Sequence, residues 1–111
     1  MVSIETAREL ALTFEEAVEL PHFEKASFRV KKKIFATIDP AKNRVVVKLS
    51  EIDQSAFCAF DISIIYPVSG SWGKQGWTYV ELDKVSKEIF EDVLKSSYCA
   101  VAPKKLAKKY L

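Results

Sequence analysis

Apolar side chains recur every three or four residues in three stretches of the chain, which is the spacing of an amphipathic helix. Each stretch follows a serine or an aspartate whose side chain can accept a hydrogen bond from the first helical amides. The sequence therefore predicts helices over 3–14, 50–60 and 83–98. In the second of these helices, the apolar positions at helical intervals are Ile52, Ala56, Ala59 and Phe60.

Between the predicted helices, β-branched and aromatic residues gather in short runs of strand length. The predicted strands are 27–30, 34–39, 44–49, 62–68 and 77–82. Pro40 and Asn43 predict a hairpin turn, because proline presets its φ and asparagine tolerates a positive one. Leu20-Pro21-His22 is predicted to be a linker into the sheet, since Pro21 disfavours a helix at the residue before it.

These elements follow the order α-βββ-α-ββ-α, with no internal repeat. Strands joined by short connections, with the helices packed on one face, predict an antiparallel sheet and the α+β class. The chain has 111 residues, of which 49% are hydrophobic and 29% charged, so we expect 1–111 to form a single domain. No apolar run approaches the ~20 residues that cross a bilayer, and we expect no membrane partner.

The net charge of +2 conceals a strong segregation of charge along the chain. Residues 1–24 carry six acids and one base, whereas residues 25–48 carry eight bases and one acid. Clustered cations on one face form a phosphate-binding footprint, because each neutralised phosphate releases counterions. The central strands are therefore a candidate nucleic-acid interface. Its basic residues are Arg29, Lys31, Lys32, Lys33, Lys42, Arg44 and Lys48.

A second part of this interface comes from 69–76, which holds all three glycines of the chain. The segment is predicted to be a flexible hairpin tip that presents Trp72, Lys74 and Gln75. Aromatic side chains beside cations can stack on bases or enter between base steps. The glycines do not form a P-loop, because the spacing is too short and a strand follows in place of a helix.

Other interpretations of the same residues remain open. Lysines on exposed or edge strands are typical of a solvated sheet surface that resists aggregation, and the four lysines of 104–109 are equally typical of a soluble tail. Trp72 and Trp77 are also compatible with packing onto the core. A third interpretation is a small-molecule pocket lined by Trp72, Trp77 and Tyr79.

The acidic first helix indicates an alternative function. Glu5, Glu9 and Glu16 form an acidic stretch that could attract a protein partner or a hard cation. A solvated helix face accounts for the same pattern. The two interpretations of the whole chain therefore use different segments, the basic strands for nucleic acid and the acidic helix for a protein or a metal.

No catalytic constellation is recognisable. His22 is the only histidine, and nothing in its spacing from Cys58 or Cys99 indicates a nucleophile with its base. The two cysteines form no C-x-x-C pair, so we expect reduced, buried thiols and a cytoplasmic protein. We accordingly predict a protein that is not an enzyme and that carries no cofactor and no metal.

Four short motifs together resemble the MmcQ/YjbR family, and the similarity spans nearly the whole chain. The motifs are Lys32-Lys33-Ile34-Phe35-Ala36, Val47-Lys48-Leu49-Ser50, Gly76-Trp77-Thr78-Tyr79-Val80 and Ser97-Tyr98. The resemblance implies a CyaY-like, or frataxin-like, two-layer sandwich. It also implies DNA binding by two wings, which would be the tips around Lys42/Arg44 and Trp72/Lys74. This chain departs from the family pattern in having Gly76 where a histidine is usual, and in lacking a proline after Ser50.

Overall fold

Six antiparallel strands form one sheet in the order β1-β2-β3-β4-β6-β5, in a computed structural model that describes all residues from 1 to 111. The strands are β1 (Val18–His22), β2 (Lys25–Val30), β3 (Lys33–Asp39), β4 (Arg44–Lys48), β5 (Ile65–Pro67) and β6 (Trp77–Glu81). The first four strands follow one another as a meander. β6 then pairs with β4, and the short β5 lies at the far edge.

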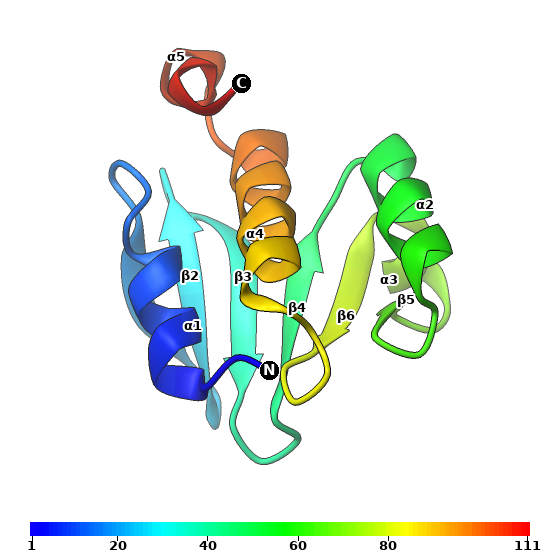
Figure 1. The fold of residues 1–111 in the computed structure, drawn as a ribbon. Helices are drawn as coiled ribbons and strands as arrows, with labels where there is room; N and C mark the ends of the chain where they lie inside the picture. The colour runs from blue at the N-terminus through cyan, green and yellow to red at the C-terminus, as the bar shows by residue number, and fades with distance from the viewer.

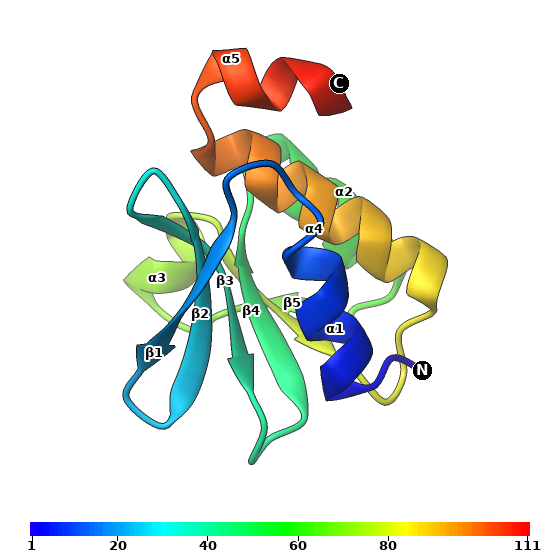
Figure 2. The same cartoon turned by 90° about the vertical axis from the view of Figure 1, so that its left-hand side faces the viewer.

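Three longer helices cover one face of this sheet (Figure 1), and a short fourth helix lies on the other side (Figure 2). The covering helices are α1 (Ile4–Ala11), α2 (Glu51–Phe60) and α4 (Lys87–Val101). The short helix is α3 (Ser71–Lys74), and the chain ends in α5 (Lys104–Ala107) and a 3-10 turn, η1 (Lys108–Tyr110). The predicted α+β class, the antiparallel sheet and the order of the predicted elements are confirmed.

The core lies between the sheet and the covering helices. Phe28, Ala36, Val47 and Thr78 are paired in succession across β2, β3, β4 and β6, and all four are buried. Side chains alternate between the two faces of a strand, so each of these strands buries one face here. Each large apolar side chain removed from water contributes about 1.5–3 kcal/mol. The opposite face of the sheet lacks a layer of long helices.

The C-terminal segment is fastened to the turn that follows α1. Tyr98 in α4 donates a hydrogen bond from its hydroxyl to the carbonyl oxygen of Glu15 at 2.6 Å. The hydroxyl of Tyr110 accepts a hydrogen bond from the Glu15 amide at 3.0 Å, and Phe14 stacks on Tyr98 with the ring centroids 4.9 Å apart. Burial raises the pKa of Tyr98 to about 12. The C-terminal part of the chain is thereby attached to the backbone of Glu15 through two tyrosine hydroxyls.

The predicted linker around Pro21 is wrong, because Val18–His22 forms the edge strand β1. β1 pairs with β2 alone, so the missing amide hydrogen of Pro21 can face away from the ladder. Its apolar side chains gave no clear strand signal, since Val18 and Leu20 are both exposed.

Two other boundaries differ from the predictions. The last long helix begins after Ser86, whose hydroxyl oxygen accepts from the amide of Ile89 at 3.2 Å, so Asp83 is not its cap. The glycine-containing segment is not an open hairpin tip, because Ser71–Lys74 forms the helical turn α3. The chain contains no helix that is both long enough and apolar enough to span a bilayer.

The apolar stripe of α2 faces outward, contrary to the usual use of such a pattern. Ile52 is 81% exposed and Phe60 is 63% exposed, whereas Cys58 is buried. The side chain of Gln54 faces inward, and its Nε2 donates to the carbonyl oxygen of Gly73 at 2.9 Å and to Thr78 Oγ1 at 3.0 Å. α2 lies over the edge of the sheet, at β5 and β6 (Figure 1). At this edge, hydrogen bonds of Gln54 connect the helix to the sheet, in addition to apolar packing.

Candidate nucleic-acid interface

The candidate interface lies on the face of the sheet opposite α1, α2 and α4, which we call the open face. Strand alternation places basic and aromatic side chains there, since their neighbours along the chain enter the core. Arg29 and Lys48, for example, alternate with the buried Phe28 and Val47. The residues of the open face on β2, β4 and β6 are Lys25, Ser27, Arg29, Arg44, Val46, Lys48, Trp77, Tyr79 and Glu81.

A hollow of about 340 Å³ lies between α3 and the open face, and we call it the aromatic hollow. Trp72 of α3 forms its outer wall and is 60% exposed, while Trp77 and Tyr79 come from β6. Its full lining is His22, Lys25, Ile34, Thr37, Val46, Val68, Trp72, Trp77 and Tyr79. No carboxylate belongs to this lining.

The position of Trp72 follows from close backbone packing of α3. A Cβ on Gly73 would lie 1.8 Å from the carbonyl oxygen of Val68, so only glycine permits this approach. The carbonyl of Gly73 is also held by Gln54 of α2. Gly76, with a φ of +107°, then returns the chain into β6, where a Cβ would lie 1.9 Å from the carbonyl oxygen of Leu49. The glycines therefore fix this segment, whereas the sequence suggested that they loosen it.

A second hollow, of about 470 Å³, adjoins the first at the end of the sheet, and we call it the lysine hollow. Its lining is Lys33, Ile34, Lys48, Trp77, Ala100 and Val101. Ile34 and Trp77 line both hollows, so a ligand can extend from one into the other. Neither Lys33 nor Lys48 forms an ion pair with the protein.

At the opposite end of the open face, Arg44 is held in a compact polar cluster. Its Cζ lies 3.9 Å from the ring centroid of Tyr79, and its Nη1 donates to the hydroxyl of Tyr66 at 3.4 Å. The Tyr66 hydroxyl donates in turn to the carboxylate of Glu81, and this hydrogen bond raises the pKa of Tyr66. Arg44 Nε is buried without a partner. Arg44 therefore lies over the ring of Tyr79 and is not a freely exposed cation.

The structure divides the predicted basic residues between two ends of the sheet. Lys31 and Lys32 form the β2–β3 turn, with φ values of +50° and +72°, and Lys33 follows them. Lys42 lies in the β3–β4 turn, which is at the other end because the strands are antiparallel. Lys31 Nζ is 2.8 Å from a carboxylate oxygen of Glu16, so this predicted cation already has an acidic partner.

The remaining candidates line neither hollow, but Arg29 pairs with Ile34 in the sheet, and Lys74 and Gln75 lie between Trp72 and Trp77 in the sequence. The guanidinium of Arg29 donates through Nε to the hydroxyl of Ser27 at 3.0 Å on the open face. Lys74 and Gln75 are exposed at the end of α3. Lys48 lies close to this segment, because its Nζ atom is 3.2 Å from the position that a Cβ atom of Gly76 would occupy. Gly76 follows Lys74 by two residues.

Of the three acidic residues of the alternative function, Glu5 and Glu16 have partners within the chain, whereas Glu9 has no ion-pair partner. Glu5 and Glu19 both bind Arg8, at 3.2 Å and 3.1 Å. The hydrogen bond that Arg8 donates to Glu19 is the first cause of a raised pKa for Arg8. Glu16 pairs with Lys31. No three potential metal-ligating side chains of the chain are gathered in one place. The glutamates thus do not converge on one site, because Glu5 and Glu19 pair with Arg8 and Glu16 pairs with Lys31.

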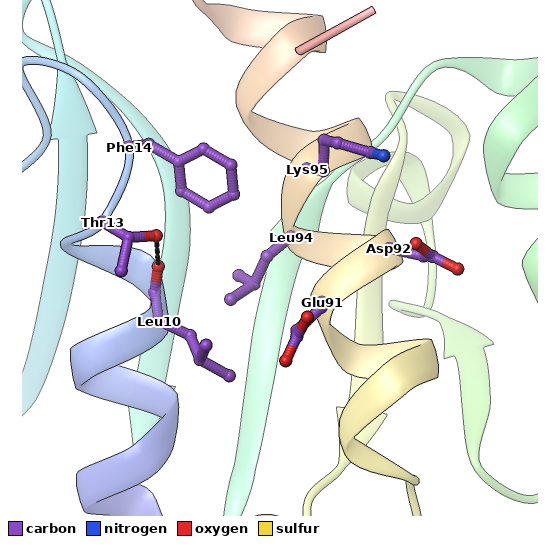
Figure 3. Close-up of a pocket in the computed structure, with 7 residues that line it drawn as sticks. All are labelled: Leu10, Thr13, Phe14, Glu91, Asp92, Leu94 and Lys95. Atoms are coloured by element: carbon purple, nitrogen blue, oxygen red, sulfur yellow. Dashed lines mark hydrogen bonds between the residues drawn. The ribbon is translucent and has the colours of Figure 1, made fainter.

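A hollow of about 220 Å³ lies between α4 and the C-terminal part of α1, the helix that carries Glu5 and Glu9. Figure 3 shows Leu10 and Leu94 facing one another across it, while Asp92 points away from α1. The hydroxyl of Thr13 is occupied by a hydrogen bond to the carbonyl oxygen of Leu10 at 2.6 Å. The lining combines the apolar Leu10, Phe14 and Leu94 with the charged Glu91, Asp92 and Lys95 of α4. None of the glutamates of the alternative function belongs to it.

Sequence reasoning missed part of the site. His22 and Lys25 line the aromatic hollow, but His22 was assigned to a linker because β1 was not recognised. The position of Val46 could have been predicted, because Arg44, Val46 and Lys48 alternate along β4 and must therefore share one face of the sheet. Trp72, Trp77 and Tyr79 do line one hollow, as the small-molecule interpretation required.

A family model and a solved structure are similar to this chain. Residues 12–100 match the family model described as YjbR. The crystal structure of protein DR2400 from Deinococcus radiodurans, with the domain DUF419, resembles this fold with a TM-score of 0.80 at 22% identity. The alignment covers 99% of this chain and 88% of that chain, and at such identity it establishes the fold alone. A comparison with curated proteins finds no match.

Proposed function

The chain belongs to the YjbR family, and on that premise we propose that it binds nucleic acid through the open face of its sheet. One observation carries the proposal. The aromatic hollow and the lysine hollow share two lining residues, and neither contains a carboxylate. Stacking surfaces beside unpaired cations are the combination that proteins use to bind nucleic acid without reading its sequence.

The cations around the hollows supply the phosphate contacts. Lys33, Lys48 and Lys74 form no ion pair with the protein, so phosphate does not have to compete with a carboxylate for them. Each phosphate contact releases condensed counterions, which favours association in dilute salt. Because such contacts carry no base information, we propose little sequence specificity.

The opposite side of the molecule disfavours the same ligand. The covering helices α1, α2 and α4 carry seven acids, namely two, two and three in turn, and three bases. Nucleic acid approaching the molecule is therefore repelled from the helical layer and attracted to the open face. The acidic α1, which suggested another function, orients the ligand in this proposal.

The proposal narrows the two-wing interpretation. Of the two wing tips implied by the resemblance, the one with Trp72 and Lys74 lies beside the hollows. The tip with Lys42 lies at the other end of β3, where Arg44 is occupied by Tyr79 and Tyr66. We propose that the first tip is the main contact and that binding, without a chemical reaction, is the activity of this cytoplasmic protein.

A salt titration tests this proposal. Binding of labelled random-sequence DNA is measured by fluorescence anisotropy at several salt concentrations, for the parent chain and for the combined variant Lys33→Ala, Lys48→Ala and Lys74→Ala. If each lysine touches one phosphate, the slope of log affinity against log salt falls by about 2 to 3 units in the variant.

A matched control removes the same charge from the helical side, through Lys84→Ala, Lys87→Ala and Lys95→Ala. All three of these lysines are exposed. This control keeps the parent slope if the open face is the interface. Equal losses in both triple variants would indicate a response to net charge alone and would contradict the proposal.

A further inference from the structure

We infer that the aromatic hollow holds one unpaired nucleotide base, with the phosphate of that nucleotide in the lysine hollow, so that the ligand is a single strand. This inference rests on the proposed function and names its substrate class. It uses Trp72 as a stacking surface, Trp77 as the wall shared by the two hollows, and Lys33 and Lys48 as the phosphate contacts.

The shape of the aromatic hollow suits a planar ring. Its volume of about 340 Å³ lies within the range of small-ligand sites, and six of its nine lining residues are hydrophobic. Trp72 rises from α3 on one side, and Val46, Trp77 and Tyr79 come from adjacent strands. In a duplex the faces of the bases are already stacked on one another, so only an unpaired base can offer its face to Trp72.

The polar groups of the hollow can meet the edge of such a base. Thr37 offers a hydroxyl, His22 an imidazole ring and Lys25 an ammonium group that lies 3.8 Å from Asp39. A hydroxyl both donates and accepts hydrogen bonds, so Thr37 does not restrict the site to one base. A few polar groups in a mostly apolar hollow orient a ligand without demanding a particular sequence.

The arrangement of the two hollows matches the connectivity of a nucleotide. A single sugar joins a base to its phosphate, so the two binding sites must adjoin. Ile34 and Trp77 line both hollows, and the lysines lie only on the second. A free planar ligand without a phosphate would leave Lys33 and Lys48 unused, whereas a nucleotide uses both halves of the site.

The exposure of Trp72 is an independent argument. Trp72 is 60% exposed although α3 is fixed on both sides, by the contact of Gly73 with Val68 and by the hydrogen bond from Gln54. The fold thus holds a large aromatic side chain at the rim without burying it. A rigid, exposed aromatic ring loses little conformational entropy when a base stacks on it.

The test compares three probes with two variants of Trp72. The probes are a single-stranded DNA oligonucleotide, a duplex of the same length and a free nucleoside monophosphate. Trp72→Ala is expected to weaken single-strand binding by about 5- to 150-fold, which is the range for one stacked base, while leaving the salt slope unchanged. Trp72→Phe keeps an aromatic surface and is expected to retain most of the affinity.

The outcomes separate this inference from the proposed function. If Trp72→Ala binds the single strand as well as the parent does, or if duplex binds as tightly as single strand, the inference is overturned and the proposed function stands. If no DNA binds but the free nucleotide binds in a Trp72-dependent way, the hollow still holds a nucleotide and the proposed function fails. If none of the probes binds, both fail. Circular dichroism of each variant verifies that it is folded.

Discussion

The hydroxyl of Tyr98 donates a hydrogen bond to the carbonyl oxygen of Glu15 at 2.6 Å, across 83 positions of sequence. The ring of Tyr98 also stacks on Phe14 and meets Phe35 edge to face. These contacts connect the last long helix to the turn after the first one. The Ser97-Tyr98 motif, which contributed to the family resemblance, therefore has a structural role.

Replacement of this hydroxyl tests that role. Tyr98→Phe keeps the ring but leaves the Glu15 carbonyl without its donor, and we expect the free energy of unfolding to fall by about 1 kcal/mol. Urea denaturation measures the change. Tyr79→Phe is a suitable comparison, because the Tyr79 ring is half-buried and its hydroxyl takes part in no hydrogen bond within the chain. Equal stability of Tyr98→Phe and the parent would show that this hydrogen bond does not contribute.

Tyr98 also predicts a dependence of stability on alkaline pH. Burial raises its pKa from 10.0 in the unfolded reference to about 12, so the folded protein favours the neutral phenol. This contribution is complete below pH 10 and is lost as the pH rises from 10 towards 12. The melting temperature of the parent is expected to fall more steeply over this interval than that of Tyr98→Phe. Parallel curves for the two proteins would refute the assignment.

Glu16 is expected to restrain nucleic-acid binding, because its carboxylate occupies Lys31 at 2.8 Å. In Glu16→Gln this lysine becomes available to a phosphate, so DNA affinity should rise several-fold in dilute salt and the salt slope by up to about 1 unit. Glu9→Gln is the control, since Glu9 forms no ion pair within the chain. An equal gain in both variants would point to net charge and not to the release of Lys31.

Gly73 predicts a link between packing and binding. In Gly73→Ala, the new Cβ would meet the backbone oxygen of Val68, so α3 must shift at a cost of about 1–3 kcal/mol. Trp72 moves with α3, and single-strand affinity should fall together with the melting temperature. Ser71→Ala, an exposed change in the same turn, should alter neither quantity. A binding loss without any change in stability would place the effect elsewhere.

The periodic core of the sheet was predictable because burial imposes a regular pattern. β2, β3, β4 and β6 alternate or cluster apolar residues, and the predicted strands overlap all of them. β1 was missed because an edge strand with exposed Val18 and Leu20 buries too little to show that pattern. The stripe of Ile52 and Phe60 identified α2 as a helix, but it did not indicate which side faces the core.

The candidate site was predictable in its residue types but not in its arrangement. Charge counts identified the basic central strands, yet they could not reveal that Lys31 pairs with Glu16, because that contact depends on how the chain turns between distant residues. Likewise, Arg44 was classed with the other cations although it stacks on Tyr79. The tertiary structure therefore selects a subset of the predicted cations and adds His22, which local pattern could not place.

The pairing of β4 with β6 has a consequence for the order of folding. Lys48 meets Trp77 only when the chain has closed a long loop through α2, β5 and α3, whereas the meander from β1 to β4 needs only short turns. Closing such a loop costs entropy before its contacts form, so this pairing is expected to come late. Until then the two halves of the site belong to separate parts of the chain. A ligand that contacts both halves can bind only the folded state in which β4 and β6 are paired. Its binding therefore stabilises that pairing against local unfolding.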